Sequence, residues 1–324
     1  MHSSTRKIFL GHVVLFAGGL TAGRAEARAP AGTVSLSYIA RLYSMKISIL
    51  GKKIRMENKY NRVEIETNSR RAYINGVMIW LHEPCRKQGS GWAIREVDFK
   101  KGIDPVLRTY AYAPKRMPRL VVLDPGHGGK DTGSISPKGY KEKDIVLDIS
   151  HRIRKLLEDR GIRVRMTRTG DTYPQLDART TYAYKNGADL FISIHANAAG
   201  ATSASGVETF ITAAAGYDSS NHYGQAGDKF AFKNNTYDAL NASLGFSIHS
   251  NVVKMTGRDD RGLRRARYSV LKHCACPAAL VECGFLTNPD EESLLNTSSY
   301  RERCARGISN GVLGYFTLIK RALR

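Results

Sequence analysis

The sequence predicts an α/β fold: a twisted, mostly parallel sheet flanked by helices and preceded by a small β-rich domain. Three observations predict it. Residues 33–106 have a strand-like pattern, and polar and apolar residues alternate over residues 62–66 at the period of two that half-buried strands show. From about residue 119, short apolar runs alternate with segments of helical period, as they do in α/β domains. Between these parts, residues 113–118 contain two prolines and are typical of a linker.

The first 27 residues are typical of a secretory signal peptide. A basic pair at residues 6–7 precedes an apolar stretch over residues 8–22, and small residues suited to cleavage follow at 25–27. The apolar stretch is short for a membrane span. We expect an exported protein, in the periplasm or in the cell wall or extracellular space, with no stable membrane span after cleavage. An uncleaved anchor or a disordered tail is the alternative.

The chain of 324 residues is strongly basic, with a formal net charge of +21. Cleavage after residue 27 leaves 47 basic and 28 acidic groups, a net charge of +19. Such a charge suits a polyanion: nucleic acid, an anionic membrane face or a cell envelope. Export, and the lack of any recognisable nucleic-acid-binding motif, favour the envelope over nucleic acid. A basic surface without a partner is the alternative.

Five cysteines are an odd number for an exported chain, so at least one is free or pairs with another chain. Cys274 and Cys276 are separated by one residue, which is not the CxxC motif of redox or zinc sites. We expect mostly packed thiols, and the sequence does not identify the partners of any disulfide. The five are Cys85, Cys274, Cys276, Cys283 and Cys304.

Residues 33–112 combine a strand pattern with hairpin signals. Residues 62–66 alternate polar and apolar side chains, and Asn75-Gly76 lies between two apolar runs, which strongly favours a hairpin. Another turn at residues 89–91 leads into a further apolar run. No Ser/His/Asp set and no metal-ligand spacing occurs in this part. We therefore expect a small β-rich module that presents a surface rather than chemistry.

Residues 119–324 carry the pattern of an α/β domain. Ile145, Ile149 and Ile153 repeat at helical spacing, and Gly161 stands where a helix C-cap belongs. Short continuous apolar runs between the helical segments predict buried strands. The predicted strands are 120–123, 162–166, 190–194 and 278–281, and the predicted helices are 145–157, 176–186, 237–255 and 300–319.

Three polar residues stand where predicted strands end. His127 follows the first strand within the motif DPGHGG, and His195 and Glu282 directly follow two later strands. In open α/β sheets, ligands bind outside the carboxyl ends of the strands, so we expect these side chains to share one crevice. Glu142 opens the helix after the first loop and is expected at the same edge.

Two histidines and a carboxylate are a common ligand set for catalytic zinc, and they leave a fourth position for water. Zinc lowers the pKa of that water to roughly 7, and amide hydrolysis then needs a separate base to pass a proton to the leaving nitrogen. The sequence supplies two carboxylates for these roles. Taken singly, each residue has a plainer interpretation, such as a structural histidine or, for Glu142, a solvated charge at a helix start. Glu282 is harder to explain without a partner, because it follows a buried apolar run.

Six motifs in order make the second domain recognisable: DPGHGG, GYKEKDIVLDI, FISIHANA, SGVETF, RGLRRARYSVL and PAALVECGFLTNPDEE. Together they resemble the zinc-dependent catalytic domain of the N-acetylmuramoyl-L-alanine amidase family, over about residues 119–319. The resemblance implies that His127, Glu142 and His195 bind Zn²⁺ and that Glu282 is the catalytic glutamate. It also implies the substrate, which is the amide bond between N-acetylmuramic acid and L-alanine in peptidoglycan.

Other polar positions keep two interpretations each. Glu208 either orients a metal ligand by a hydrogen bond or is a charge at a strand edge. Asn197 either contacts the substrate or caps a turn. Arg264 and Arg265 belong to a group of five arginines over residues 258–267. These arginines clamp stem-peptide carboxylates by forked hydrogen bonds, or they form a plain basic surface.

Two regions suggest partners. Residues 213–236 are long for a connection, which favours a substrate wall or a gating segment. Some members of the resembling family carry an insertion there that folds over the zinc cleft until a partner removes it, so a protein activator is expected to act on residues 213–236. The β-rich module resembles the module at the start of copper amine oxidases, or an envelope-targeting β-domain ahead of some cell-wall amidases.

Two alternative functions stay open at this point. One is a zinc peptidase or deacetylase that acts on another envelope substrate with the same machinery. The other is a non-catalytic envelope-binding protein that uses the basic surface and the β-rich module. The presence of all four polar residues favours an enzyme over a binding protein, and the resemblance implies that its substrate is peptidoglycan.

Overall fold

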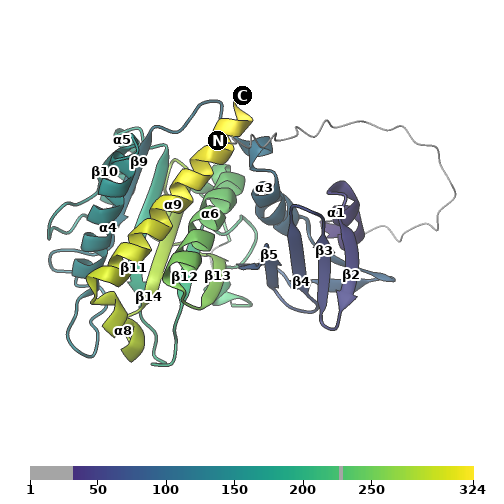
Figure 1. Ribbon diagram of the computed structural model, residues 1–324, viewed down its shortest axis with the longest axis horizontal. Coiled ribbons are helices and arrows are strands. Elements are labelled where there is room, and N and C mark those ends of the chain that lie inside the picture. Colours follow the sequence, from purple (N-terminus) through teal and green to yellow (C-terminus); the bar gives the residue numbers. More distant parts are fainter. Residues whose placement is uncertain (1–31, 226–228) are drawn as a thin grey trace, which may run out of the picture.

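The computed structural model describes residues 32–225 and 229–324 (Figure 1). The predicted signal peptide, residues 1–27, lies outside these residues. In the part of the chain that the structure describes, no helix combines the length and the apolar character that a membrane span requires. All five cysteines are buried free thiols, and the sulfur atoms of Cys274 and Cys276 lie 3.5 Å apart.

The N-terminal module, residues 33–112, is built on an antiparallel meander. Asn75 and Gly76 both have positive φ angles, of 52° and 86°, as a two-residue hairpin turn requires. The predicted hairpin is therefore confirmed. The meander comprises β2 (Lys46–Leu50), β3 (Lys53–Glu57), β4 (Arg62–Glu66), β5 (Arg71–Ile74) and β6 (Val77–Trp80), and a separate small sheet comprises β1 (Thr33–Ser35), β7 (Arg86–Gln88) and β8 (Gly91–Arg95).

The module also contains helices where the sequence predicts only strands. Helix α1 (Leu36–Leu42) begins after Ser35, whose side chain accepts a hydrogen bond from the backbone N–H of Tyr38. It buries Leu36 and Ile39, but two turns are too short to show a helical period in the sequence. Four more short helical elements close the module: α2 (Glu96–Asp98), η1 (Phe99–Ile103), α3 (Asp104–Leu107) and η2 (Thr109–Tyr112).

The second part of the chain forms a mostly parallel sheet, which confirms the predicted fold class. Its strands run in the order β10-β9-β11-β14-β12-β13, and only β12 and β14 are antiparallel neighbours in this part. Strands β11 and β14 continue beyond the predicted ends, so His195 and Glu282 lie inside them. The strands are β9 (Leu120–Pro125), β10 (Arg163–Met166), β11 (Leu190–Asn197), β12 (Val207–Ile211), β13 (Asp260–Arg265) and β14 (Ala278–Phe285).

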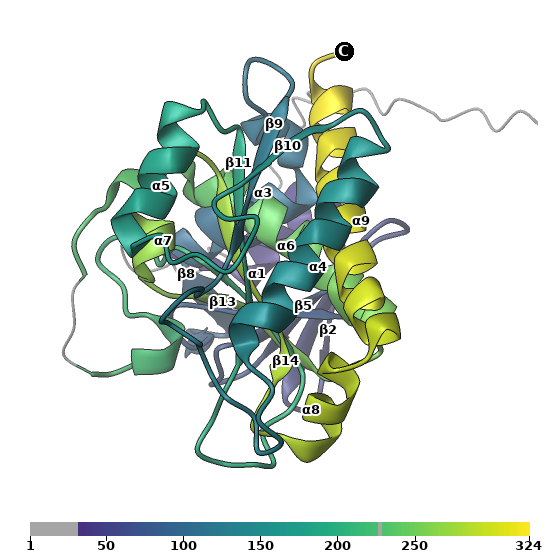
Figure 2. The same ribbon diagram turned by 90° about the vertical axis from the view of Figure 1, so that its left-hand side faces the viewer.

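Helices cover both faces of this sheet (Figure 2). One face carries α4, α6 and α9, with α9 packed against both α4 and α6, and the other face carries α5 and α7. The predicted helices are confirmed, with ends that differ by a few residues. The helices are α4 (Glu142–Glu158), α5 (Leu176–Lys185), α6 (Asp238–Thr256), α7 (Ser269–Lys272), α8 (Pro289–Leu295) and α9 (Ser298–Ala322), with short turns at η3 (Ser220–His222) and η4 (Lys233–Tyr237).

One sheet runs through both parts of the chain. Strand β6 of the module pairs in parallel with β13 through Ile79 and Leu263, which gives eleven hydrogen-bonded strands among the described residues (Figure 1). Side chains reinforce this junction: the carboxylate of Asp260 accepts a hydrogen bond from the backbone N–H of Met78 at 2.8 Å. The module is thus joined to the strands of the second part of the chain by main-chain pairing, and not only by the connection at residues 113–119.

Candidate active site

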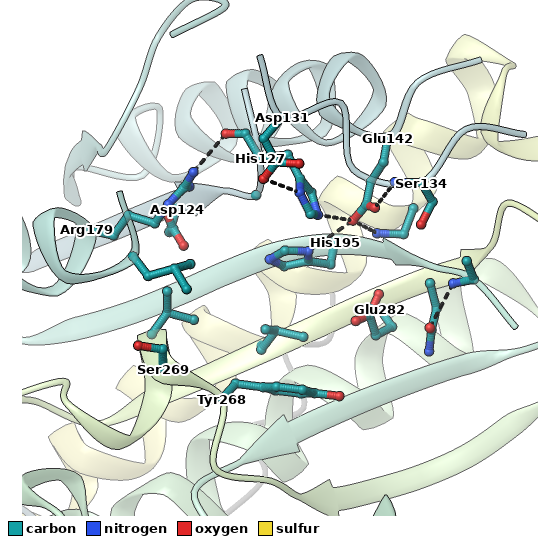
Figure 3. A pocket seen from close by; sticks show the side chains of 17 residues that line it. Asp124, His127, Asp131, Ser134, Glu142, Arg179, His195, Tyr268, Ser269 and Glu282 are labelled. Atoms are coloured by element: carbon teal, nitrogen blue, oxygen red, sulfur yellow. Dashed lines mark hydrogen bonds and ion pairs between the residues drawn. The ribbon is translucent and has the colours of Figure 1, made fainter. Parts of the chain in front are cut away.

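Three predicted residues converge at the carboxyl edge of the sheet. His127 lies in the loop after β9, Glu142 is the first residue of α4, and His195 lies on β11. The Oε1 atom of Glu142 is 3.1 Å from Nε2 of His127 and 3.0 Å from Nδ1 of His195. One donor atom from each of the three residues lies within 4.8 Å of the other two. Figure 3 shows the three side chains turned toward one another.

Hydrogen bonds from the surroundings orient these side chains. The carboxylate of Asp131 accepts a hydrogen bond from Nδ1 of His127 at 2.9 Å, which leaves Nε2 as the nitrogen that faces Glu142. The backbone N–H groups of Ser134 and Ala196 donate to the two oxygens of Glu142, at 2.9 and 3.1 Å. Sequence reasoning did not single out Asp131, although its position four residues after His127 in the same loop is a usable signal.

Two glycines allow the side chains to approach closely. A Cβ atom on Gly126 would lie 2.3 Å from the ring of His195. At Gly133, whose φ is +64°, a Cβ atom would lie 2.6 Å from both the carboxylate of Glu142 and the ring of His127. Any larger residue at either position would therefore displace one of the converging groups.

The donors fit a metal ion by their chemistry. Burial lowers the pKa of His127, but the carboxylates of Glu142 and Asp131 outweigh burial and raise it overall. Burial raises the pKa of Glu142, but hydrogen bonds from the two imidazoles outweigh burial and hold it well below its usual value. Two imidazole nitrogens and one ionised carboxylate, converging on a single point, match the ligand set of catalytic zinc sites with three protein ligands.

Glu282 lies beside this group but is not part of it. It is on β14 directly across from His195, and both line one pocket of about 360 Å³. Its side chain is 8 % exposed, and its buried Oε2 atom has no hydrogen-bond partner among the described residues. Burial, followed by the nearby carboxylates of Glu142 and Glu208, raises the pKa of Glu282 well above its usual value. A buried oxygen without a partner is costly, so this carboxylate is set up to meet a group that enters the pocket.

The other predicted residues divide into two sets. Asn197 lines the pocket, and its side-chain N–H₂ donates to Glu208 at 3.0 Å. Glu208 is buried, and its other oxygen accepts a hydrogen bond from Nε of Arg261 at 2.7 Å, with Nε of Arg264 at 3.4 Å. These contacts form a network on one side of the pocket.

Arg265 lies outside this network. Its buried guanidinium donates to the backbone carbonyls of Trp80 and Lys101, at 2.8 and 3.2 Å. Because these bonds point toward the N-terminal module, the side chain of Arg265 is placed to hold the junction and not to clamp a substrate carboxylate.

Sequence reasoning also missed a buried ion pair beneath the DPGHGG motif. Nη1 of Arg179 donates to the carboxylate of Asp124 at 2.8 Å, and Nη2 donates to the backbone carbonyl of His127 at 2.8 Å. Both residues are almost fully buried. They fix the loop that carries His127, and an arginine in the middle of a predicted helix gave no sign of this role.

The described residues of segment 213–236 do not line the pocket, but they approach its wall. The side-chain amide of Asn221 donates to the hydroxyl of Tyr268 at 3.3 Å, and Tyr268 lines the pocket. The hydroxyl of Tyr223 donates to Glu83 of the N-terminal module at 3.0 Å. The segment therefore lies between the module and the pocket wall.

An α/β sheet with this arrangement at its carboxyl edge is typical of a metal-dependent hydrolase. Three converging metal donors, a neighbouring carboxylate outside the donor set and an open pocket are the parts that a metal-dependent hydrolase needs. Comparison with known proteins identifies the family within this class.

The family model described as N-acetylmuramoyl-L-alanine amidase matches residues 121–313. The chain is 37% identical over 220 residues to N-acetylmuramoyl-L-alanine amidase AmiA of Salmonella typhimurium, covering 61% of this chain and 76% of that protein. It is 34% identical over 222 residues to AmiC of Neisseria meningitidis, covering 60% and 52%.

Solved structures give the same result. The catalytic domain of the amidase CwlV from Bacillus (Paenibacillus) polymyxa superposes with a TM-score of 0.53 and 28% identity, covering 62% of this chain and 99% of that domain. The amidase from Clostridium difficile 630 superposes with a TM-score of 0.52 and 33% identity, covering 62% and 98%.

The chain therefore belongs to the N-acetylmuramoyl-L-alanine amidase family. It is an N-acetylmuramoyl-L-alanine amidase, which hydrolyses the amide bond between N-acetylmuramic acid and L-alanine in peptidoglycan. The family match begins at residue 121, so it does not include the N-terminal module, and it gives no support to a resemblance with copper amine oxidases.

Proposed function

We propose that this amidase is an exported enzyme in which His127, Glu142 and His195 hold Zn²⁺ and Glu282 is the general base. The observation that carries this proposal is the convergence of two imidazoles and one carboxylate in a pocket where a second, buried carboxylate has an unpartnered oxygen. Glu142 is the carboxylate that contacts both imidazoles, so we assign it as the zinc ligand and Glu282 as the general base.

In this proposal, the zinc site and Glu282 have separate roles in hydrolysis of the amide bond. Zinc supplies Lewis acidity in such a site and lowers the pKa of water to roughly 7. Glu282 accepts a proton from the attacking water while the water oxygen bonds to the lactyl carbonyl carbon. When the carbon–nitrogen bond breaks, Glu282 returns that proton to the nitrogen of L-alanine. The products are a free carboxyl group on the glycan and a stem peptide with a free amino terminus.

The surroundings of the site support recognition of peptidoglycan. Asn197 lines the pocket and is proposed to contact the substrate, while Glu208 and Arg264 support the wall behind it. The basic chain suits an anionic envelope polymer. The signal-peptide pattern of residues 1–27 supports export to the periplasm or cell wall.

The accessory regions take proposed roles from their positions in the chain. The N-terminal module, residues 33–112, precedes the catalytic domain, residues 119–324, and is proposed to contribute to envelope targeting. A protein activator is proposed to act on segment 213–236, which lies against the wall of the pocket through Asn221 and Tyr268.

Digestion of purified sacculi, with and without a chelator, tests the proposal. The expected result is release of intact stem peptides with L-alanine at the amino terminus, loss of that release with chelator, and recovery on addition of zinc. Mass analysis of the fragments separates the alternatives, because a peptidase shortens the stems and a deacetylase leaves them on the glycan. Either of those product patterns, or release that chelation does not change, would contradict the proposal.

A further inference from the structure

The N-terminal module contacts residues 261–264 through Trp80. This residue ends β6, and its indole N–H donates to the backbone carbonyl of Arg261 at 2.9 Å. The guanidinium of Arg264 lies 4.9 Å from the centre of the same indole. Between the two arginines, a Cβ atom on Gly262 would lie 2.8 Å from the ring. The indole therefore packs closely against residues 261–264.

The two arginines that contact Trp80 hold a buried carboxylate. Nε of Arg261 donates to Oε1 of Glu208 at 2.7 Å, and Nε of Arg264 lies 3.4 Å from the same oxygen. Glu208 is only 3 % exposed, so its buried carboxylate depends on these cations as its ion-pair partners. A shift of either arginine would leave a buried charge without compensation.

Glu208 is next to the proposed general base. It lies directly across from Glu282 in the pairing of β12 with β14, and its second oxygen accepts a hydrogen bond from Asn197, which lines the pocket. The contacts thus run without a gap from Trp80, through the two arginines and Glu208, to the strand position of Glu282. Each step is a hydrogen bond, an ion pair, a cation–π contact or a strand pairing between neighbouring residues.

A second set of contacts runs from the module to Arg264 and to Tyr268, which lines the pocket. The hydroxyl of Tyr223 donates to Glu83, and the guanidinium of Arg70 lies 4.1 Å from the centre of the Tyr223 ring. Two residues earlier, the side chain of Asn221 accepts a hydrogen bond from Arg264 at 3.1 Å and donates one to Tyr268 in the pocket. The module therefore restrains Arg264 both directly and through this segment.

We propose that Trp80 is a positioning residue for the amidase reaction, and that the N-terminal module is a built-in support of the active site. Trp80 fixes the backbone of Arg261 and the side chain of Arg264, and these fix Glu208 and Asn197 beside Glu282. The inference rests on the proposed role of Glu282, and it gives the N-terminal module a role in positioning active-site residues in addition to the proposed role in envelope targeting.

Substitution of Trp80 tests this proposal in the full-length zinc enzyme. Trp80→Phe keeps an aromatic ring but removes the N–H donor, and Trp80→Leu also removes the aromatic face. The matched control is Trp92→Phe, which changes the only other tryptophan of the chain, on β8 of the same module. With a soluble muropeptide as substrate, we expect kcat to fall by about threefold to tenfold in Trp80→Leu and less in Trp80→Phe. Zinc content and KM should change by less than about twofold, and Trp92→Phe should match the wild type.

A double-mutant cycle separates positioning from general stability. Glu208→Gln should lower kcat, and its combination with Trp80→Phe should lose no more than the larger single effect, because both act through one network. Wild-type kcat in both Trp80 variants, or losses that multiply in the double variant, would overturn the proposal. If Trp80→Leu does not fold, the more conservative Trp80→Phe decides. Turnover that survives in Glu282→Gln would instead count against the proposed function, which keeps the two failures distinct.

Discussion

The carboxyl edge of the catalytic sheet and the N-terminal module use buried polar residues in different ways. At the sheet edge, Glu142 and Glu282 are buried around an open pocket, and Glu282 keeps an oxygen without a partner. In the module, the buried side chains of His82 and Asp98 bond to each other, and Nε2 of His82 accepts a hydrogen bond from the backbone N–H of Ala214 in the second part of the chain at 3.3 Å. The first region keeps a buried polar group available to a ligand, whereas the second uses such groups to join two parts of one chain.

The largest effect is expected when the free carboxylate at the sheet edge is removed. Glu282→Gln should lower kcat by about 10²–10⁴-fold, because the amide cannot accept a proton from water. Activity on a soluble muropeptide measures the effect, and circular dichroism checks the fold. The control is Glu158→Gln, which changes an exposed glutamate at the end of α4. If Glu282→Gln turns over at a rate near that of the control, the base lies elsewhere.

A smaller loss is expected when Asp131, which orients the proposed zinc ligand His127, is changed. Asp131→Asn keeps the size of the side chain but weakens the acceptor for Nδ1 of His127. Zinc affinity should fall by about 10- to 100-fold, as measured by competition with a chromogenic chelator. Asp159→Asn, on an exposed carboxylate at the end of α4, should have no effect. Unchanged affinity in Asp131→Asn would show that His127 needs no such support.

The sequence predicted the parts of this enzyme that depend on local pattern. Strands β9, β10, β11 and β14 of the catalytic sheet, its main helices and the four residues at its carboxyl edge were identified from apolar periodicity and motifs, whereas β12 and β13 were not. Contacts between distant segments were not identified. Trp80 and Arg261 are 181 positions apart, and neither β6–β13 pairing nor the Arg179–Asp124 ion pair leaves a periodic trace in the sequence. Helix α1 was missed for a different reason: at seven residues it is too short to show a helical repeat of apolar side chains.

The smallest predicted effect concerns the pH dependence of the junction. Burial, followed by the charge of Arg265, lowers the pKa of His82 despite the neighbouring Asp98. Since the unfolded state then binds a proton more readily than the folded state, stability is lost as pH falls below about 6.5. The thermal midpoint should drop by about 2–4 °C between pH 7 and pH 5 from this group. The drop should be smaller in His82→Gln, and an equal drop in both proteins would remove His82 as its source.

The zinc content of purified variants distinguishes the three proposed zinc ligands from the proposed general base. We predict one zinc ion per chain in the wild type and in Glu282→Gln, and a large loss of zinc in His127→Ala, Glu142→Ala and His195→Ala, measured by elemental mass spectrometry on folded protein. Full zinc occupancy in any of the three ligand variants, or loss of zinc in Glu282→Gln, would contradict the division of these four residues into three ligands and one free base.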